Sequence, residues 1–189
     1  MADQGTEGLL SPYLRYRRCA AAKPYFSGEI LDLGCGTGSL AKYISPNSYL
    51  GVDIDPLSLE MARSRHPEHE FQSELPSIEQ KFDTVLALAV IEHVVNPEEF
   101  LVTCSKHLNA ASSARIVITT PHPSFEKFHY FGSLVGVFSR HANEEHQELL
   151  DYQGLVSVSN SAGLALVHYK RFLFGGNQLA IFQKPNKTS

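Results

Sequence analysis

The feature that most constrains this chain is a short apolar run that leads into three closely spaced glycines. The run Ile30–Leu33 is followed by Gly34, Gly36 and Gly38. Glycine lets the backbone approach a ligand closely, and a helix that begins behind such a turn presents free N–H groups. The pattern therefore predicts a strand that feeds a ligand-binding turn, the start of a βαβ unit.

The spacing of the glycines distinguishes between kinds of nucleotide ligand. A dinucleotide fingerprint, G-x-G-x-x-G, would place its third glycine at position 39, which is Ser39. Asp32, at the end of the strand, has the wrong charge to face a pyrophosphate but suits a ligand that carries an ammonium and a sulfonium group. The motif therefore favours S-adenosylmethionine over a nicotinamide dinucleotide.

With its D-x-G-x-G-x-G pattern, the segment resembles the first motif of class I S-adenosylmethionine-dependent methyltransferases. The resemblance implies S-adenosylmethionine as cofactor and S-adenosylhomocysteine as product. It also implies that the turn holds the methionine part of the cofactor through Asp32, Gly34, Gly36 and Gly38, with Leu33 and Cys35 as further cofactor-binding residues.

A second acidic residue follows the next apolar run. Asp53 lies 19 residues after Gly34, where a carboxylate can accept hydrogen bonds from both ribose hydroxyls; its alternative role is to cap the next helix. The family resemblance implies that Ile54 packs against the adenine. It also implies that Ser73 and Glu74 contact the adenine amino group, although the family more often has Asp there, and both residues also fit a solvated loop.

The run from Phe82 to Val94 resembles the fourth-strand signature of the subgroup that includes ubiquinone and menaquinone biosynthesis methyltransferases. By this resemblance Leu88 and Ala89 line the cofactor site, and Glu92 and His93 stand near the methyl acceptor. His93 has the side-chain chemistry of a general base, and a structural hydrogen bond within the loop is the alternative.

The Glu-His pair also raises a metal-dependent alternative. Relatives that methylate the 2′-hydroxyl of RNA use E-x-x-E-H and a later histidine, but here Ala89 occupies the first Glu position. Glu92, His93 and either His146 or His122 would remain as ligands, and the lost carboxylate weakens the case for a hard cation. We therefore expect no metal, and keep Glu92, His93 and His146 as candidate catalytic residues.

Two further segments are candidates for the walls of the site. The N-terminal segment, residues 1–27, contains a predicted helix with the only basic cluster of the chain, and its Arg17 could meet the cofactor carboxylate; a solvated helix face is the alternative. Residues 120–150 are irregular and rich in aromatic and histidine residues. This length and composition predict a lid or substrate segment, with a cover over the sheet or a dimer contact as alternatives.

The order of the predicted elements gives the fold class. With 189 residues, the chain is expected to form one methyltransferase domain over residues 1–189. Strands that alternate with helices predict an α/β, doubly wound, mostly parallel seven-stranded sheet with a C-terminal antiparallel hairpin, the Rossmann-like methyltransferase fold. The predicted strands are 29–33, 48–53, 70–73, 82–88, 115–119, 164–169 and 178–182, and the predicted helices are 13–25, 39–44, 56–65, one starting at 96–97, and 151–162.

Composition narrows the range of partners. A net charge of −4 gives no global basic field for nucleic acid or an anionic membrane, and no stretch is apolar enough to span a bilayer. Three scattered cysteines fit a reducing, cytoplasmic compartment. We expect a small-molecule acceptor methylated on O, N or C, with a homodimer left open. A metal-assisted RNA methyltransferase and a non-catalytic cofactor-binding partner protein are the alternatives.

Overall fold

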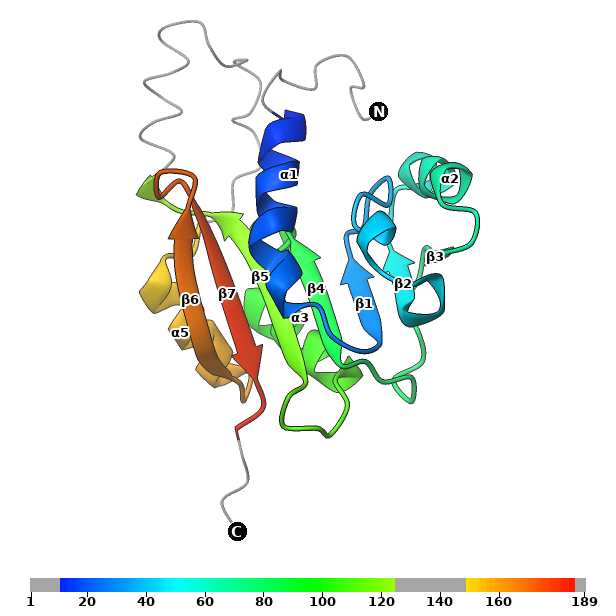
Figure 1. Ribbon diagram of the computed structural model, residues 1–189. Helices are drawn as coiled ribbons and strands as arrows, with labels where there is room; N and C mark the ends of the chain where they lie inside the picture. Colours follow the sequence, from blue (N-terminus) through cyan, green and yellow to red (C-terminus); the bar gives the residue numbers. More distant parts are fainter. Residues whose placement is uncertain (1–10, 125–148, 186–189) are drawn as a thin grey trace, which may run out of the picture.

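A single mixed sheet organises the chain. The computed structural model describes residues 11–124 and 149–185, and within them seven strands lie in the order β3-β2-β1-β4-β5-β7-β6 (Figure 1). The first five strands pair in parallel, whereas β7 runs antiparallel to both β5 and β6. The predicted fold class is therefore confirmed, including the C-terminal hairpin. The strands are β1 (Ile30–Leu33), β2 (Tyr49–Val52), β3 (Glu70–Gln72), β4 (Thr84–Leu88), β5 (Arg115–Pro121), β6 (Ala165–Phe172) and β7 (Asn177–Gln183).

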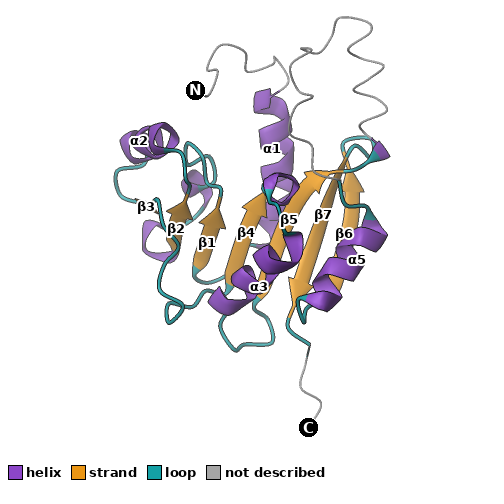
Figure 2. Cartoon of the chain, turned by 180° about the vertical axis from the view of Figure 1, so that it is seen from behind, coloured by secondary structure: helices purple, strands orange, loops and turns teal. Residues whose placement is uncertain are grey.

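Helices cover both faces of this sheet. Helix α1 (Ser11–Ala22) crosses one face, whereas α3 (Pro97–His107) and α5 (Tyr152–Ser161) lie on the other (Figures 1 and 2). Helix α2 (Pro56–Arg65) follows β2, and its N-cap is Asp55, whose side chain accepts a hydrogen bond from the Ser58 amide at 3.1 Å. The cap and bounds of α2 agree with the sequence prediction, because Asp before Pro is a strong local start signal.

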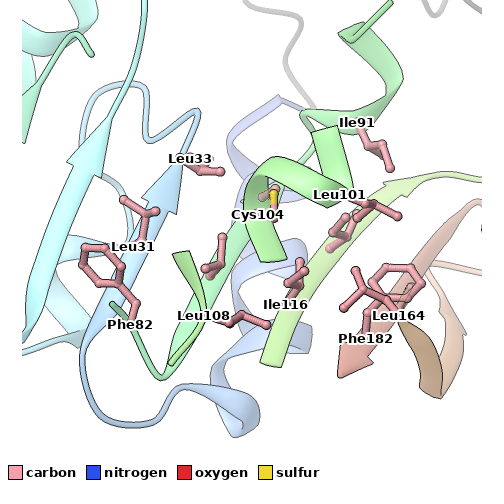
Figure 3. Close-up of a cluster of buried hydrophobic side chains, with 14 of the residues drawn as sticks. Leu31, Leu33, Phe82, Ile91, Leu101, Cys104, Leu108, Ile116, Leu164 and Phe182 are labelled. Carbon is pink, nitrogen blue, oxygen red and sulfur yellow. The ribbon is translucent and has the colours of Figure 1, made fainter. Parts of the chain in front are cut away.

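Two apolar layers fill the space between sheet and helices. The layer under α3 and α5 contains Leu31, Leu33, Leu101, Ile116 and Phe182, each at most 5% exposed (Figure 3). The layer on the opposite face is built by residues of α1, α2, the sheet and the segment after the glycine turn, among them Cys19, Ala22, Leu40, Ala41, Leu59, Ala62, Leu86 and Val117. Parallel strands buried on both faces explain the nearly continuous apolar runs of β1 and β4.

The sequence prediction fails over residues 39–44. Instead of an α-helix, the segment forms a turn and a 3₁₀-helix, Ala41–Tyr43, followed by a second one, Pro46–Ser48. Pro46 holds the preceding Ser45 in an extended conformation (ψ 137°), which prevents a helix from continuing through it. The predicted strand over 82–88 begins only at Thr84, and Phe82 forms an isolated bridge with Leu108. Other boundaries shift by one to three residues.

Candidate functional site

The carboxyl ends of β1 and β4 open onto a cavity of about 620 Å³. Strand order reverses between these two strands, since β2 and β3 lie on one side of β1 and β5 lies beyond β4. Open α/β sheets bind ligands at such a switch point. The cavity is lined by Arg15, Arg18, Asp32, Gly34, Cys35, Gly36, Thr37, Ser39, Leu40, Asp55, Ser58, Met61, Arg65, Leu88 and Ala89.

Asp32 supplies a buried carboxyl group to this cavity. Side chains alternate along β1, so Leu31 and Leu33 enter the layer under α3 and α5 while Asp32 faces the other side. Asp32 is 2% exposed and its Oδ2 accepts a hydrogen bond of 2.7 Å from the Tyr49 hydroxyl. Burial raises the pKa of Asp32 to about 7; the Tyr49 bond lowers it and the charge of Asp53 raises it further.

The glycine turn places three positive-φ residues beside Asp32, at φ 69°, 52° and 74° for Gly34, Gly36 and Gly38. A Cβ on Gly34 would lie 2.5 Å from Cγ2 of Val90, so this position is closed by packing. A Cβ on Gly36 would meet nothing within 4 Å, and Gly36 lines the cavity. The turn is therefore tightly packed behind Gly34 and open toward a ligand at Gly36.

Two other members of the first motif take different places. Leu33 is buried in the apolar layer under α3 and α5, away from the cavity lining. Cys35 is 5% exposed and lines the cavity, and burial raises the pKa of its thiol, so the group stays protonated at neutral pH.

Asp53 connects the glycine turn to the start of α2. Its Oδ2 accepts a hydrogen bond of 2.7 Å from the Gly36 amide, and its Oδ1 accepts one of 2.9 Å from the Asp55 amide. A carboxylate offers about four lone-pair sites, so Asp53 keeps acceptor capacity for further donors. The alternative in which Asp53 caps the helix does not hold, because Asp55 occupies the N-cap.

Helix α2 lines the cavity with residues that sequence reasoning missed. Asp55, Ser58, Met61 and Arg65 follow one another at intervals of three or four residues, which places them on one face of the helix. The spacing of these residues in the sequence was the signal that could have identified them as one face of the helix.

Helix α1 contributes two arginines to the cavity lining, and Arg17, for which cofactor binding was predicted, is not one of them. Arg15 and Arg18 line the cavity, whereas Arg17 donates a 2.7 Å hydrogen bond to the hydroxyl of Tyr13, one turn away. Nε of Arg18 also donates to Oδ1 of Asn177 at 3.0 Å. Burial lowers the pKa of Arg18, and the negative charge of Glu92 opposes this shift.

The end of β4 and the residue that follows it border the cavity near the centre of the sheet. Leu88 and Ala89, both predicted to bind the cofactor, line it. Ala89 has φ 61° and donates its amide to the Thr119 carbonyl at 2.7 Å. A left-handed conformation is unfavourable for alanine, and strain of this kind is common where backbone is shaped for a ligand.

Glu92 and His93 lie just beyond, in the 3₁₀-helix Ile91–His93. Oε2 of Glu92 is buried and has no hydrogen-bond partner among the described residues. Burial raises the pKa of Glu92, while the Arg18 charge and a hydrogen bond from Thr120 lower it. The His93 side chain is exposed, and neither residue is part of the cavity lining.

The remaining predicted residues either lie outside the cavity lining or belong to segments outside the described residues. Ile54 is 91% exposed, and Ser73 and Glu74 are exposed, so these three are free of the core but do not line the cavity. His146 and most of the predicted lid lie outside the described residues.

In residues 11–124 and 149–185 no group of three His, Cys, Asp or Glu side chains is arranged to hold a metal ion. Among the helices described there, none has both the length and the apolar character that crossing a bilayer requires.

Comparison with known proteins gives the same picture of the fold. In the crystal structure of magnesium protoporphyrin IX methyltransferase from Synechocystis PCC 6803 with bound S-adenosylhomocysteine, 90% of that chain aligns with 96% of this one. The TM-score is 0.70 and the sequence identity 14%. This likeness shows a shared fold.

Curated relatives differ in the acceptor that their names state. Ribosomal RNA small subunit methyltransferase C of Haemophilus influenzae is 30% identical over 145 residues, which is 68% of this chain and 41% of that protein. Ubiquinone biosynthesis O-methyltransferase of Roseobacter denitrificans is 32% identical over 105 residues, which is 49% of this chain and 41% of that protein. The chain thus spans about two-fifths of the length of each.

The family assignment rests on a match that covers most of the chain. Residues 11–169 match the family described as a methyltransferase domain, and they include α1, the glycine turn, α2 and the segment after β4. The sheet order and the cavity at its switch point agree with that match. The chain therefore belongs to the methyltransferase domain family, with the class I fold that its first motif predicted.

Proposed function

We propose that this protein transfers a methyl group from S-adenosylmethionine to an acceptor. The observation that carries the proposal is the cavity of about 620 Å³ at the switch point, where Gly36 is open and the Asp32 carboxyl group is buried. Small-molecule cofactor sites have volumes of this order, with a few polar groups that fix orientation. A buried carboxyl group beside an open glycine turn fits a ligand that carries a cationic amino-acid tail on a nucleoside.

Each end of the cofactor would meet its own group of residues. Asp32 would accept hydrogen bonds from the ammonium group, and Arg15 or Arg18 would face the carboxylate. Asp53 would receive the ribose hydroxyls on its remaining lone pairs. Ile54 would cover the adenine, and its 91% exposure leaves an apolar surface for that contact. Ser73 and Glu74 remain the proposed partners of the adenine amino group.

Leu88 and Ala89 would border the reacting end of the cofactor. When bound, S-adenosylmethionine supplies a methyl group on a positively charged sulfur. Alignment of the acceptor opposite that group accounts for most of the catalysis in an in-line displacement. Glu92 and His93 follow Ala89 directly and would lie on the acceptor side, where either could take a proton from the acceptor.

For the acceptor we propose a small molecule methylated on oxygen, nitrogen or carbon. Two observations support this choice: the chain has a net charge of −4, and it is similar to a ubiquinone biosynthesis O-methyltransferase. Three free, buried cysteines, Cys19, Cys35 and Cys104, support a reducing, cytoplasmic setting as part of the proposal.

A ribosomal RNA acceptor is the second candidate, favoured by the similarity to ribosomal RNA small subunit methyltransferase C. The two candidates differ in their response to salt, since binding to RNA phosphates weakens steeply as salt rises. Methyl transfer to ribosomal RNA at low salt, with none to a metabolite extract, would replace the small-molecule proposal. If EDTA abolished that transfer, the reaction on RNA would also require a divalent metal ion.

Calorimetric titration with S-adenosylmethionine and S-adenosylhomocysteine tests the cofactor itself. We expect saturable binding of both with one site per chain, strongly weakened in Asp53→Ala and unchanged in Lys184→Ala, whose side chain contacts the Leu108 carbonyl away from the cavity. No binding at millimolar ligand would refute the proposal. Binding without any consumption of S-adenosylmethionine in a metabolite extract or with RNA would favour a non-catalytic partner protein.

A further inference from the structure

Tyr49 donates the hydrogen bond that reaches Asp32 from the neighbouring strand. The register pairs Tyr49 with Ile30 and Gly51 with Asp32, so the tyrosine approaches Asp32 diagonally across β1 and β2. The two side chains are 4% and 2% exposed, and the Oη–Oδ2 distance is 2.7 Å. This is a short bond between two buried side chains, where a hydroxyl donor has a large effect on a carboxylate.

Contacts around the ring hold the Tyr49 hydroxyl in this direction. The ring packs edge-on against Phe71 of β3, at 5.7 Å between centroids, and against His69, at 5.5 Å. A Cβ on Gly51 would lie 2.6 Å from the Phe71 ring, so the glycine makes room for this packing. Burial and the negative charge of Asp32 raise the pKa of Tyr49, and the hydroxyl therefore remains a donor throughout the neutral range.

Other ionisable groups also influence the Asp32 carboxyl group. Cys35 from the glycine turn and Cys19 from α1 interact electrostatically with Asp32, and burial raises the pKa of both thiols. Asp53 adds a negative charge, which favours protonation of Asp32. Arg15 and Arg18 of α1 line the same cavity as Asp32. Among the described residues, the Tyr49 hydroxyl donates a hydrogen bond directly to the Asp32 side chain.

We propose that Tyr49 is a positioning residue for the cofactor: its hydroxyl fixes the Asp32 carboxylate so that the remaining lone pairs receive the ammonium group of S-adenosylmethionine. This inference rests on the proposed function. Tyr49 does not line the cavity, so it acts through Asp32 rather than by contact with the ligand.

Binding of the cofactor is expected to depend on pH through Asp32. An ammonium group binds the ionised form of Asp32, whose pKa lies at about 7, so affinity falls as the pH drops below about 7. Loss of the Tyr49 hydrogen bond raises this pKa, and one unit corresponds to a factor of ten in affinity at low pH. At high pH Asp32 is ionised both in the wild type and in a variant without the Tyr49 hydroxyl, so the two proteins should bind the ligand with similar affinity.

The experiment compares wild type with Tyr49→Phe, which removes one oxygen and keeps the ring. S-adenosylhomocysteine binding is measured from pH 6 to pH 9, together with 5′-methylthioadenosine, which keeps the nucleoside and thioether but has no ammonium group. We expect the variant to bind S-adenosylhomocysteine about tenfold more weakly at pH 6 and about equally at pH 9. Binding of 5′-methylthioadenosine should differ little between the two proteins at any pH.

Matched controls separate a positioning role from a structural one. Tyr169→Phe removes a tyrosine hydroxyl that donates to Gln178 at 3.0 Å, remote from Asp32, and should leave the pH profile unchanged. Should Tyr49→Phe fail to fold, 3-fluorotyrosine at position 49 strengthens the donor and should move the midpoint to lower pH. An unmoved midpoint, or an equal loss of both ligands in Tyr49→Phe, overturns the inference. Failure of the wild type to bind either ligand refutes the proposed function instead.

Discussion

A glycine in this turn can be required for its left-handed backbone conformation or for the close approach of a ligand, and Gly36→Ala separates these two requirements. Gly36 has φ 52°, and a Cβ there would meet no protein atom within 4 Å. The substitution therefore costs only the left-handed conformation, about 1–2 kcal/mol, partly offset by the lower entropy of the unfolded alanine chain. We expect a net loss of about 1 kcal/mol and a melting temperature lower by about 3 °C.

Cofactor binding should suffer much more than stability in this variant. Gly36 lines the cavity that the ligand would fill, so the new methyl group would compete with the ligand for space, and overpacking by one methyl group costs about 1–3 kcal/mol. This predicts S-adenosylhomocysteine binding weaker by about tenfold or more, measured by calorimetry beside a thermal melt.

Two other glycines provide the comparison. Gly163 has φ 69° with nothing within 4 Å of its Cβ, and it ends α5 away from the cavity, so Gly163→Ala should match the stability loss but bind ligand normally. Gly34→Ala adds a clash with Val90 at 2.5 Å and should cost about 2–4 kcal/mol in total. Wild-type ligand affinity in Gly36→Ala would refute the reasoning that the turn approaches a ligand at this residue.

Three further substitutions test separate parts of the structure. The pKa of Asp32 is raised from 3.8 to about 7, so the buried carboxyl group increasingly destabilises the fold as pH rises between these values. Urea unfolding should therefore show Asp32→Asn more stable than wild type at pH 8, by up to about 4 kcal/mol, with little difference at pH 4, and a disadvantage at pH 8 would contradict the assigned burial cost. Ala89→Gly relieves φ 61° and should raise the unfolding free energy by about 0.5–1 kcal/mol; a loss would show that Ala89 is unstrained. Asp151→Ala removes the N-cap bond to the Gly154 amide and should cost about 1 kcal/mol in the same assay, with unchanged S-adenosylhomocysteine affinity as the check that α5 is remote from the site.

Local signals explain why the fold could be predicted from sequence. Asp55 before Pro56 and Asn96 before Pro97 are caps whose hydrogen bonds depend on three or four neighbouring residues, and both caps form. The buried strands β1 and β4 show as apolar runs because their burial is uniform. The helix expected at 39–44 failed because Pro46 stands too close to its end.

The sequence does not reveal which arginines of α1 line the cavity, because this depends on how the helix lies on the sheet. Cys19 and Ala22 are buried, and they fix the face that α1 turns toward the core. Arg15 and Arg18 share this side of the helix at intervals of three or four residues, whereas Arg17 is rotated away. Burial of two small residues in an alanine-rich helix is too weak a pattern to identify that face beforehand.

Asp32 shows how a local departure from the folding rules marks the site. A strand that is otherwise apolar carries a carboxyl group with 2% exposure, and burial alone makes its ionised form unfavourable near neutral pH. Tyr49 reduces that cost without removing it, and an amide would accept the same hydrogen bond with no charge to desolvate. A sequence selected for stability alone would not keep an aspartate here. A cationic ligand in the cavity would stabilise the ionised carboxylate and so explain why it is kept. The stability gained in Asp32→Asn should therefore accompany loss of cofactor binding.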